Sequence, residues 1–221
     1  MSEQSKSSHY YPIFLGISNQ KCVVFGGGNV ALRKVRMLLD HGAKVDVISP
    51  VFCPELRHLA ENNEISTLHR GFEAKDLIDA TVAIAATDST ETNENIAAEA
   101  RRQGTLVNVV DNPLHSDFIV PSYLKRGDIT IAVSTSGKSP ALARKIRSKI
   151  EHEFGNEYAQ LALLVSEVRL DLKKQDIAID NDVWQEALNL ESLTELLRNG
   201  KNQEAKDTLL GNLKKRGQRK Q

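Results

Sequence analysis

The sequence predicts an α/β protein: a doubly wound parallel sheet, then a small α+β segment, then a C-terminal helical region. Short apolar runs typical of strands alternate with helical patterns up to about residue 110. These runs are apolar on both faces, which favours a parallel sheet with helices on both sides. After Asp111 the rhythm changes, because two strand-like runs follow each other and only helical patterns remain beyond Ser139.

Five strands are expected in the first part. Their sequences are KCVVF, AKVDVIS, EISTL, TVAIAA and TLVNVV. Helical patterns follow the first, second and fourth runs, at VALRKVRMLLDHG, residues 54–62 and residues 91–103. Gly42 and Gly104 each follow a helical pattern and precede a strand run, where a left-handed residue commonly ends a helix. The predicted boundaries of helices and strands therefore agree.

The second half is expected to contain one pair of strands and then helices. FIVPSYL and DITIAVS are separated by a polar KRG turn, and Pro121 makes the first of them an edge or broken strand. Helices are predicted over residues 140–153 and 157–174, with two or three shorter ones before the basic end KKRGQRKQ. We expect that end to be a frayed, solvated tail.

The composition argues against several classes of function. Lys and Arg number 29, as do Asp and Glu, so no overall field favours a nucleic acid or an anionic membrane. Cys22 and Cys53 lack metal-ligand spacing and the six histidines are scattered, so no permanent metal site is expected. No apolar run approaches the ~20 residues of a membrane span, and the start lacks a signal-peptide pattern. We expect a cytoplasmic protein.

Gly26, Gly28 and Ala31 form a G-x-G-x-x-A pattern between the first strand and the first helix. Such a stretch is either a structural turn or a surface for a dinucleotide. Its place in the first βαβ unit favours the dinucleotide: one glycine permits the turn, the next admits a pyrophosphate, and the small third residue lets helix and strand approach. The helix N-terminus then offers N–H groups to the phosphates. We interpret this part as a Rossmann-like domain.

The end of the second strand bears on the choice of cofactor. An acidic residue that binds the adenosine ribose is expected about 20 residues after the glycines. Here Ser49, Pro50 and Val51 form the ribose-proximal turn, and Asp46 lies inside the strand run. No arginine stands there to bind a 2′-phosphate, so NAD is favoured over NADP.

Two further residues stand at carboxyl ends of strands, where ligands of such sheets bind. Thr87 ends the fourth strand and Asp111 ends the fifth. The Asp111 carboxylate either points into the cleft where a nicotinamide reacts or makes an Asx-type turn with Asn112 and Pro113.

The loop STSGK, residues 134–138, is a second candidate site. It precedes a predicted helix with Ser139 as N-cap and Pro140 at the first helical position. The loop offers N–H and O–H donors and one lysine, which suit carboxylate or phosphate groups. The alternative is a well-capped structural helix with solvated cations on its surface.

Taken together, the motifs resemble the precorrin-2 dehydrogenase family, the NAD-dependent enzymes of sirohaem synthesis, some of which are also sirohydrochlorin ferrochelatases. The resemblance rests on YPIFLGI, VFGGGNVALRK, AATD, NVVDNP, DFIVPSYLKRG and AVSTSGKSPALARKIR, in family order over about residues 10–170. It implies an NAD-binding Rossmann domain over residues 1–112, a dimerisation segment over 113–149 that exchanges strands between protomers, and a helical domain over 150–221.

The resemblance also assigns site residues. It places the catalytic aspartate on Asp111, for both dehydrogenation and chelation, and nucleotide contacts on Asn29, Val30, Pro50 and Val51. We expect substrate contacts from a set of polar residues near the two candidate sites: Asn108, His115, Ser134, Thr135, Ser136 and Lys138. Some members carry a phosphorylated serine at the position of Thr135, so no regulatory phosphorylation is expected here.

The expected function is therefore NAD-dependent oxidation of precorrin-2 to sirohydrochlorin by a homodimer, with Fe²⁺ as a candidate second substrate. Precorrin-2 is a polycarboxylate, so the hydroxyl-rich loop and the cationic helix after it would have a use. The alternative from another class is a non-catalytic dinucleotide-sensing regulatory module. Such a module would share the glycine loop and the strands, but it would not need NVVDNP followed by STSGKSP.

Overall fold

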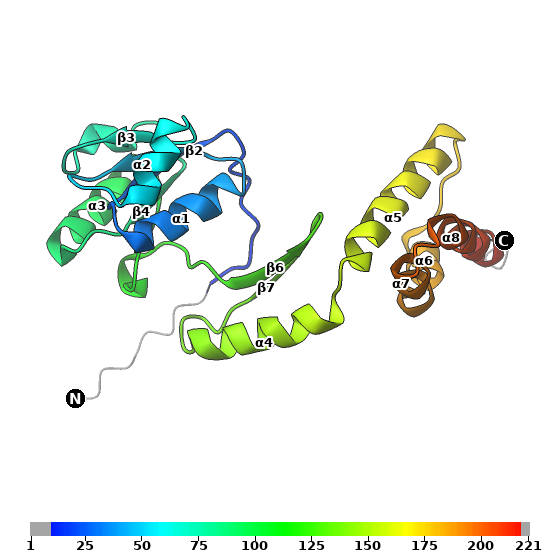
Figure 1. The fold of residues 1–221 in the computed structure, drawn as a ribbon. Helices are drawn as coiled ribbons and strands as arrows, with labels where there is room; N and C mark the ends of the chain where they lie inside the picture. The colour runs from blue at the N-terminus through cyan, green and yellow to red at the C-terminus, as the bar shows by residue number, and fades with distance from the viewer. Residues whose placement is uncertain (1–9, 218–221) are drawn as a thin grey trace. The chain divides into compact units, whose positions relative to one another are not determined.

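The protein, described here by a computed structural model over residues 10–217, divides into two compact units. The first unit ends at Val120 and the second begins at Pro121 (Figure 1). Each unit contains its own buried apolar clusters. The expected roles of residues 113–149 as a dimerisation segment and of residues 150–221 as a separate helical domain stay predictions.

The first unit is a five-stranded parallel sheet with strand order β3-β2-β1-β4-β5 and helices on both faces (Figure 1). Its elements, in chain order, are β1 (Lys21–Phe25), α1 (Asn29–Leu39), β2 (Lys44–Ile48), α2 (Pro54–Glu61), β3 (Ser66–Leu68), η1 (Ala74–Leu77), β4 (Val82–Ala85), α3 (Thr90–Gln103), β5 (Leu106–Val109) and η2 (Pro113–His115). The doubly wound sheet predicted from the sequence is confirmed, with each expected strand in place.

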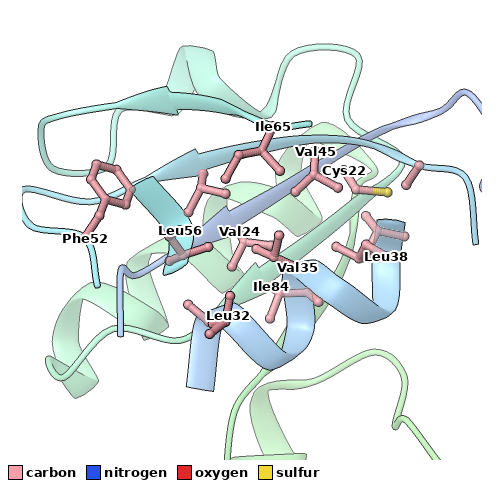
Figure 2. Close-up of a cluster of buried hydrophobic side chains, with 14 residues drawn as sticks. Cys22, Val24, Leu32, Val35, Leu38, Val45, Phe52, Leu56, Ile65 and Ile84 are labelled. Carbon is pink, nitrogen blue, oxygen red and sulfur yellow. The ribbon is translucent and has the colours of Figure 1, made fainter. Parts of the chain in front are cut away.

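Side chains of the central strand β1 alternate between two cores. Cys22 and Val24 belong to the cluster that α1 and α2 cover (Figure 2), while Val23 and Phe25 belong to the cluster beneath α3. All four are at most 1% exposed. Burial of such a side chain stabilises the fold by roughly 1.5–3 kcal/mol relative to leaving it in water. The near-continuous apolar character of this strand follows from its burial on both faces.

Two glycines end helices as predicted. Gly42 and Gly104 have φ angles of +75° and +77°, a left-handed conformation that costs a glycine little. Gly104 is the C-cap of α3, and its N–H donates to the carbonyl of Arg101. The chain then enters β5, so the cap fixes where the last strand of the sheet begins.

The strand order places the loops after β1 and β4 next to each other. β1 pairs with β2 on one side and with β4 on the other, so successive crossovers leave β1 in opposite directions. Ligands of doubly wound sheets bind at this switch point, outside the carboxyl ends of the strands. The glycine stretch that begins at Gly26 therefore opens onto the place where a ligand is expected.

Residues after β5 extend the first unit to Val120 through hydrogen bonds to that strand. The Asp117 carboxylate accepts a bond from the Val107 N–H (3.0 Å), and the Asp117 N–H donates to the Val107 carbonyl (2.8 Å). The amide nitrogen of Asn108 donates to the Phe118 carbonyl (3.0 Å). These bonds fix the segment that follows Asp111 against the edge of the sheet.

The second unit starts with an antiparallel pair of strands. β6 (Ser122–Arg126) and β7 (Ile129–Val133) pair in the register Arg126↔Ile129. β6 begins after Pro121, which has no N–H for the ladder. The turn was expected over KRG, but it lies at Gly127 and Asp128, because Gly127 has the positive φ (+57°) that so short a connection needs.

Helices make up the rest of this unit: α4 (Pro140–Glu153), α5 (Glu157–Lys174), α6 (Asn181–Ala187), α7 (Leu190–Arg198) and α8 (Asn202–Gly217). α5 to α8 share one core around Val168, Trp184 and Leu209. The expected tail over residues 214–221 is partly wrong. Lys214–Gly217 continue α8, and Arg216 lies 3.2 Å from Glu186 in an ion pair, whereas residues 218–221 lie outside the described part of the chain.

Within residues 10–217, none of the helices has the length and apolar character needed to cross a bilayer. The same residues contain no cluster of three or more His, Cys, Asp or Glu side chains arranged to hold a metal ion.

The two thiols should differ in reactivity. Burial raises the pKa of the Cys22 thiol from 9.0 to about 11, although a hydrogen bond involving Val82 lowers it slightly. Cys53 is only partly buried. Because thiolates are the reactive form, a disulfide reagent at pH 8 should modify Cys53 in the native protein and Cys22 only after denaturation. Equal rates for both thiols in the folded protein would contradict the structure.

The raised pKa of Cys22 also makes the stability of the fold depend on pH. The unfolded chain releases this proton near pH 9 and the folded chain near 11, so this contribution to stability is complete below pH 9 and falls as the pH rises towards 11. Cys22→Ala should remove this part of the alkaline decline in denaturant titrations.

Candidate functional site

The three consecutive glycines after β1 have different structural surroundings. Gly26 has φ +124°, and a Cβ there would overlap the carbonyl oxygen of Ala86 at the end of β4. A Cβ at Gly27 would overlap the carbonyl oxygen of Val51 after β2. Gly28 has φ −90° and no atom within 4 Å of the place a Cβ would take. The fold itself thus requires glycine at 26 and 27 but not at 28, where the open space suits a ligand.

The N-terminus of α1 adjoins this open space. Gly28 is its N-cap, no side chain caps the helix, and its first turn contains no acidic residue. The first intrahelical bond runs from the Leu32 N–H to the Gly28 carbonyl (3.0 Å), which leaves the N–H groups of Asn29, Val30 and Ala31 without helical acceptors. Free N–H groups and a positive dipole beside an exposed glycine fit the pyrophosphate of a dinucleotide such as NAD.

The turn after β2 presents an uncharged surface beside the glycines. The Ser49 hydroxyl donates to the Val51 carbonyl (2.8 Å), so it is used inside the turn. Pro50 is exposed and Val51 is 75% exposed. The Cys53 N–H donates to the Gly27 carbonyl (2.8 Å), which joins this turn to the glycine loop. Contacts from Ser49, Pro50 and Val51 to a cofactor stay predictions.

Thr87, at the end of β4, has its hydroxyl engaged within the protein. The hydroxyl donates to the side-chain oxygen of Asn93 (2.8 Å) and accepts from the Ser89 N–H (3.3 Å). The predicted role of Thr87 in cofactor binding therefore fits its backbone better than its hydroxyl. Asn93 was not expected from the sequence. The pattern that could have revealed Asn93 is its place as a polar residue in the otherwise apolar buried stripe of α3.

Asp111 lies in the turn that follows β5 and is exposed. Its φ is +59°, a left-handed conformation that Asp and Asn adopt more readily than other non-glycine residues. An Asx turn would need a backbone N–H two residues on, and Pro113 has none. Among the described residues no hydrogen-bond or ion-pair partner of the Asp111 carboxylate is found. The carboxylate is thus available at the carboxyl edge of the sheet.

Lys34 is the charged group that the structure adds to this edge. It lies on α1, where burial lowers its pKa from the ordinary value, the charge of Arg33 lowers it further, and the charge of Asp111 raises it. The Asp111 and Lys34 side chains therefore interact electrostatically although they come from opposite ends of the first unit's sequence. Sequence analysis missed Lys34, because nothing in VALRKVRMLL distinguishes it from a solvated lysine.

The other predicted residues of the first unit have structural contacts. Asn108 is buried and holds the segment after β5 through its bond to Phe118. The His115 ring lies 3.8 Å from the Glu94 carboxylate on α3. The structure thus brings the glycine loop, the turn after β2, Thr87 and Asp111 to one edge of the sheet. Substrate contacts from Asn108 and His115 stay predictions.

The loop at residues 134–138 belongs to the second unit and uses its hydroxyl groups locally. Ser134 Oγ accepts from the Ser136 N–H (3.0 Å), and Thr135 Oγ1 accepts from the Ser139 N–H (3.0 Å). Ser139 caps α4 by accepting from the Leu142 N–H (3.2 Å). Ser136 and Lys138 are exposed. The loop is therefore a well-built cap whose remaining donors can face a ligand, and its substrate contacts stay predictions.

Comparison with known proteins identifies the family. Residues 13–122 match a family described as "Putative NAD(P)-binding", and residues 126–153 match the family described as "Sirohaem biosynthesis protein central". The sirohaem synthase of Thioalkalivibrio sulfidiphilus is 40% identical over 202 residues, which are 90% of this chain. The chain belongs to the sirohaem synthase family. The resemblance inferred from the sequence motifs is thereby confirmed.

This chain matches less than half of the length of these curated relatives. The chain spans 41% of the T. sulfidiphilus protein and 42% of the sirohaem synthase of Nitrosomonas europaea, to which it is 38% identical. A solved precorrin-2 dehydrogenase matches 93% of this chain and all of its own length, with a TM-score of 0.69 and 20% identity. At that identity the match supports the fold.

Substitutions in the glycine stretch should separate folding from nucleotide binding. Gly28→Val should keep a folded protein and abolish NAD binding, because its side chain would fill only the open space at the N-terminus of α1. Gly27→Ala adds a smaller group but forces it into the Val51 carbonyl, so it should lower the melting temperature. Calorimetry would measure both quantities. Normal NAD affinity in Gly28→Val would show that the pyrophosphate does not lie there.

Proposed function

We propose that this chain is an NAD-dependent precorrin-2 dehydrogenase that produces sirohydrochlorin. Two features at one edge of the sheet carry the proposal. One is the glycine cradle, by which we mean the open space beside Gly28 together with the free N–H groups at the N-terminus of α1. The other is the available Asp111 carboxylate. Membership of the sirohaem synthase family and the fold of a solved precorrin-2 dehydrogenase support the choice of substrate.

In the proposed reaction precorrin-2 loses two hydrogens, one as a hydride and one as a proton. Bound NAD⁺ supplies the hydride acceptor, and the remaining proton passes to a base or to water, so the products are sirohydrochlorin, NADH and H⁺. The pyrophosphate lies over Gly26–Val30 and is held by the free backbone N–H groups at the N-terminus of α1. The Asp111 carboxylate takes the proton or holds the tetrapyrrole by its pyrrole N–H groups. Because no hydrogen bond or ion pair to its carboxylate is found among the described residues, its lone pairs are free for either role.

Insertion of Fe²⁺ into sirohydrochlorin is the second proposed reaction, and its support is the family resemblance. Chelation replaces two pyrrole protons with the metal, which is a substrate here and not a resident cofactor. A carboxylate such as Asp111 can accept one of these protons or bind the incoming ion with its oxygen atoms.

A homodimer built through residues 113–149 is part of the proposal. In the described part of the chain, the sheet of β6 and β7 has two strands, and an isolated two-stranded sheet is only marginally stable in water. Its open edges can pair with a second protomer. The neighbouring helix α4 also exposes apolar side chains, of which Leu142 is 52% exposed.

Asp111→Asn tests the proposed chemistry. Asn tolerates the left-handed conformation as Asp does, so the variant should fold and bind NAD but lose most precorrin-2 oxidation, by ~10²–10⁴-fold. An anaerobic assay with precorrin-2 and NAD, followed by absorbance, measures the rate. Asp88→Asn is the matched control, because Asp88 is an exposed carboxylate that follows β4.

Each outcome of that assay has a distinct meaning. Near-wild-type turnover of Asp111→Asn would remove Asp111 from the mechanism. If Fe²⁺ insertion survives while oxidation is lost, the two reactions use different groups. NAD binding by the wild-type chain without any oxidation of precorrin-2 would favour the alternative, a dinucleotide-sensing module.

The oligomeric state gives a separate test. Light scattering at micromolar concentration should give twice the mass of one chain, because the strand pair and α4 bury their apolar surface against a partner. Leu142→Glu on α4 should shift the equilibrium towards monomer. Leu170→Glu on α5 should not, although Leu170 is equally accessible at 56% exposure. A monomeric wild-type protein would contradict the proposed dimer.

A further inference from the structure

Asn93 is a buried polar residue in an otherwise apolar stripe. It lies in the first turns of α3 on the same face as Ile96, Ala97 and Ala100, and it is 9% exposed. A buried amide lowers stability unless its donors and acceptors are paired. Helix α3 does not need it as a cap, since the Ser89 hydroxyl already accepts from the Thr92 N–H (3.1 Å).

The hydrogen bonds of the Asn93 side chain all go to one residue. Its Oδ1 accepts from the Thr87 N–H (3.2 Å) and from the Thr87 hydroxyl (2.8 Å), and its Nδ2 donates to the Thr87 carbonyl (3.0 Å). The backbone N–H, the backbone C=O and the side chain of Thr87 are therefore all held by a single amide. Such a set of bonds fixes both the position and the orientation of the chain as it leaves β4.

The peptide that Asn93 holds forms one wall of the glycine loop. A Cβ at Gly26 would overlap the Ala86 carbonyl and would lie 3.3 Å from the Thr87 nitrogen, so no gap separates the two loops. The Ala86 N–H also donates to the Phe25 carbonyl (2.8 Å), which joins the ends of β1 and β4. A shift of residues 86–87 would therefore displace Gly26 and the cradle that follows it.

We infer that Asn93 is a positioning residue for NAD. It holds Thr87, and through Thr87 it fixes the glycine loop at the switch point of the sheet. This inference rests on the proposed dinucleotide site. We call the three hydrogen bonds between Asn93 and Thr87 the clamp. In this inference the Thr87 hydroxyl belongs to the clamp and is not a direct ligand of the cofactor. The amide of Asn93 lies behind the loop, so its effect on NAD is through backbone position.

Asn93→Ala removes the clamp and should raise the dissociation constant of NAD by ~10-fold, by letting the wall of the cradle move. Calorimetry on the full chain gives this constant. In steady-state kinetics the KM for NAD should rise while the KM for precorrin-2 changes little, a split that general destabilisation would not produce. The matched control is Asn95→Ala, because Asn95 is exposed on the same helix two residues away.

A double variant tests the route through Thr87. Thr87→Val in the wild-type background should weaken NAD binding, because it removes the hydroxyl that donates to Asn93. In the Asn93→Ala background it should cause no further loss, since the clamp is already absent. Additive losses would show that the Thr87 hydroxyl affects NAD binding independently of Asn93, and they would overturn the inference.

Asn93→Asp covers the case in which Asn93→Ala does not fold. It keeps an acceptor for the Thr87 N–H and hydroxyl. In place of the donor to the Thr87 carbonyl it puts a negative oxygen that repels this carbonyl, so a folded protein with weakened NAD binding is expected. Unchanged NAD affinity in a folded Asn93 variant would overturn the inference and leave the proposed function intact. A wild-type protein that does not bind NAD would instead overturn both.

Discussion

Close contact between backbones at the carboxyl edge of the sheet is the constraint on which the site depends. Gly26 lies against the Ala86 carbonyl and Gly27 against the Val51 carbonyl, so the loops after β1, β2 and β4 touch without intervening side chains. Only glycine permits this at both positions. The contact leaves Gly28 and the N-terminus of α1 facing outward, where N–H groups are free. The shape of the cradle is thus a consequence of how three parallel strands end beside one another.

Electrostatics at the same edge involves few groups, and they come from distant parts of the sequence. Asp111 follows β5 and Lys34 lies on the first helix, yet their charges interact. The cost of burying part of Lys34 lowers its pKa, and the carboxylate opposes that change. Because Asp111 lacks another partner among the described residues, it remains accessible to a ligand.

The second unit differs from the first in how its apolar surface is covered. α5 to α8 enclose an apolar core of their own, but β6, β7 and α4 leave apolar and hydrogen-bonding surface uncovered within the described residues. The loop at residues 134–138 is held by its own hydroxyl groups, which accept bonds from Ser136 and Ser139 and so shape the start of α4. A loop fixed in this way can present Lys138 and several N–H groups in a constant arrangement.

The sequence alone determined the alternation of strands and helices, the glycine stretch and the family, because burial on both faces, helix-ending glycines and contiguous motifs are local patterns. It also placed Asp111 at a strand end. It could not distinguish the three glycines, since Gly26 and Gly27 are required by the backbone of Ala86 and Val51, which belong to other loops far along the chain. Nor could it find Asn93, whose bonds to Thr87 depend on the exact path of the short connection from β4 to α3. It also missed Lys34, whose partner Asp111 is brought near by the strand order. Tertiary structure decided these points, because backbone contact and charge interaction depend on distance in space and leave no local pattern.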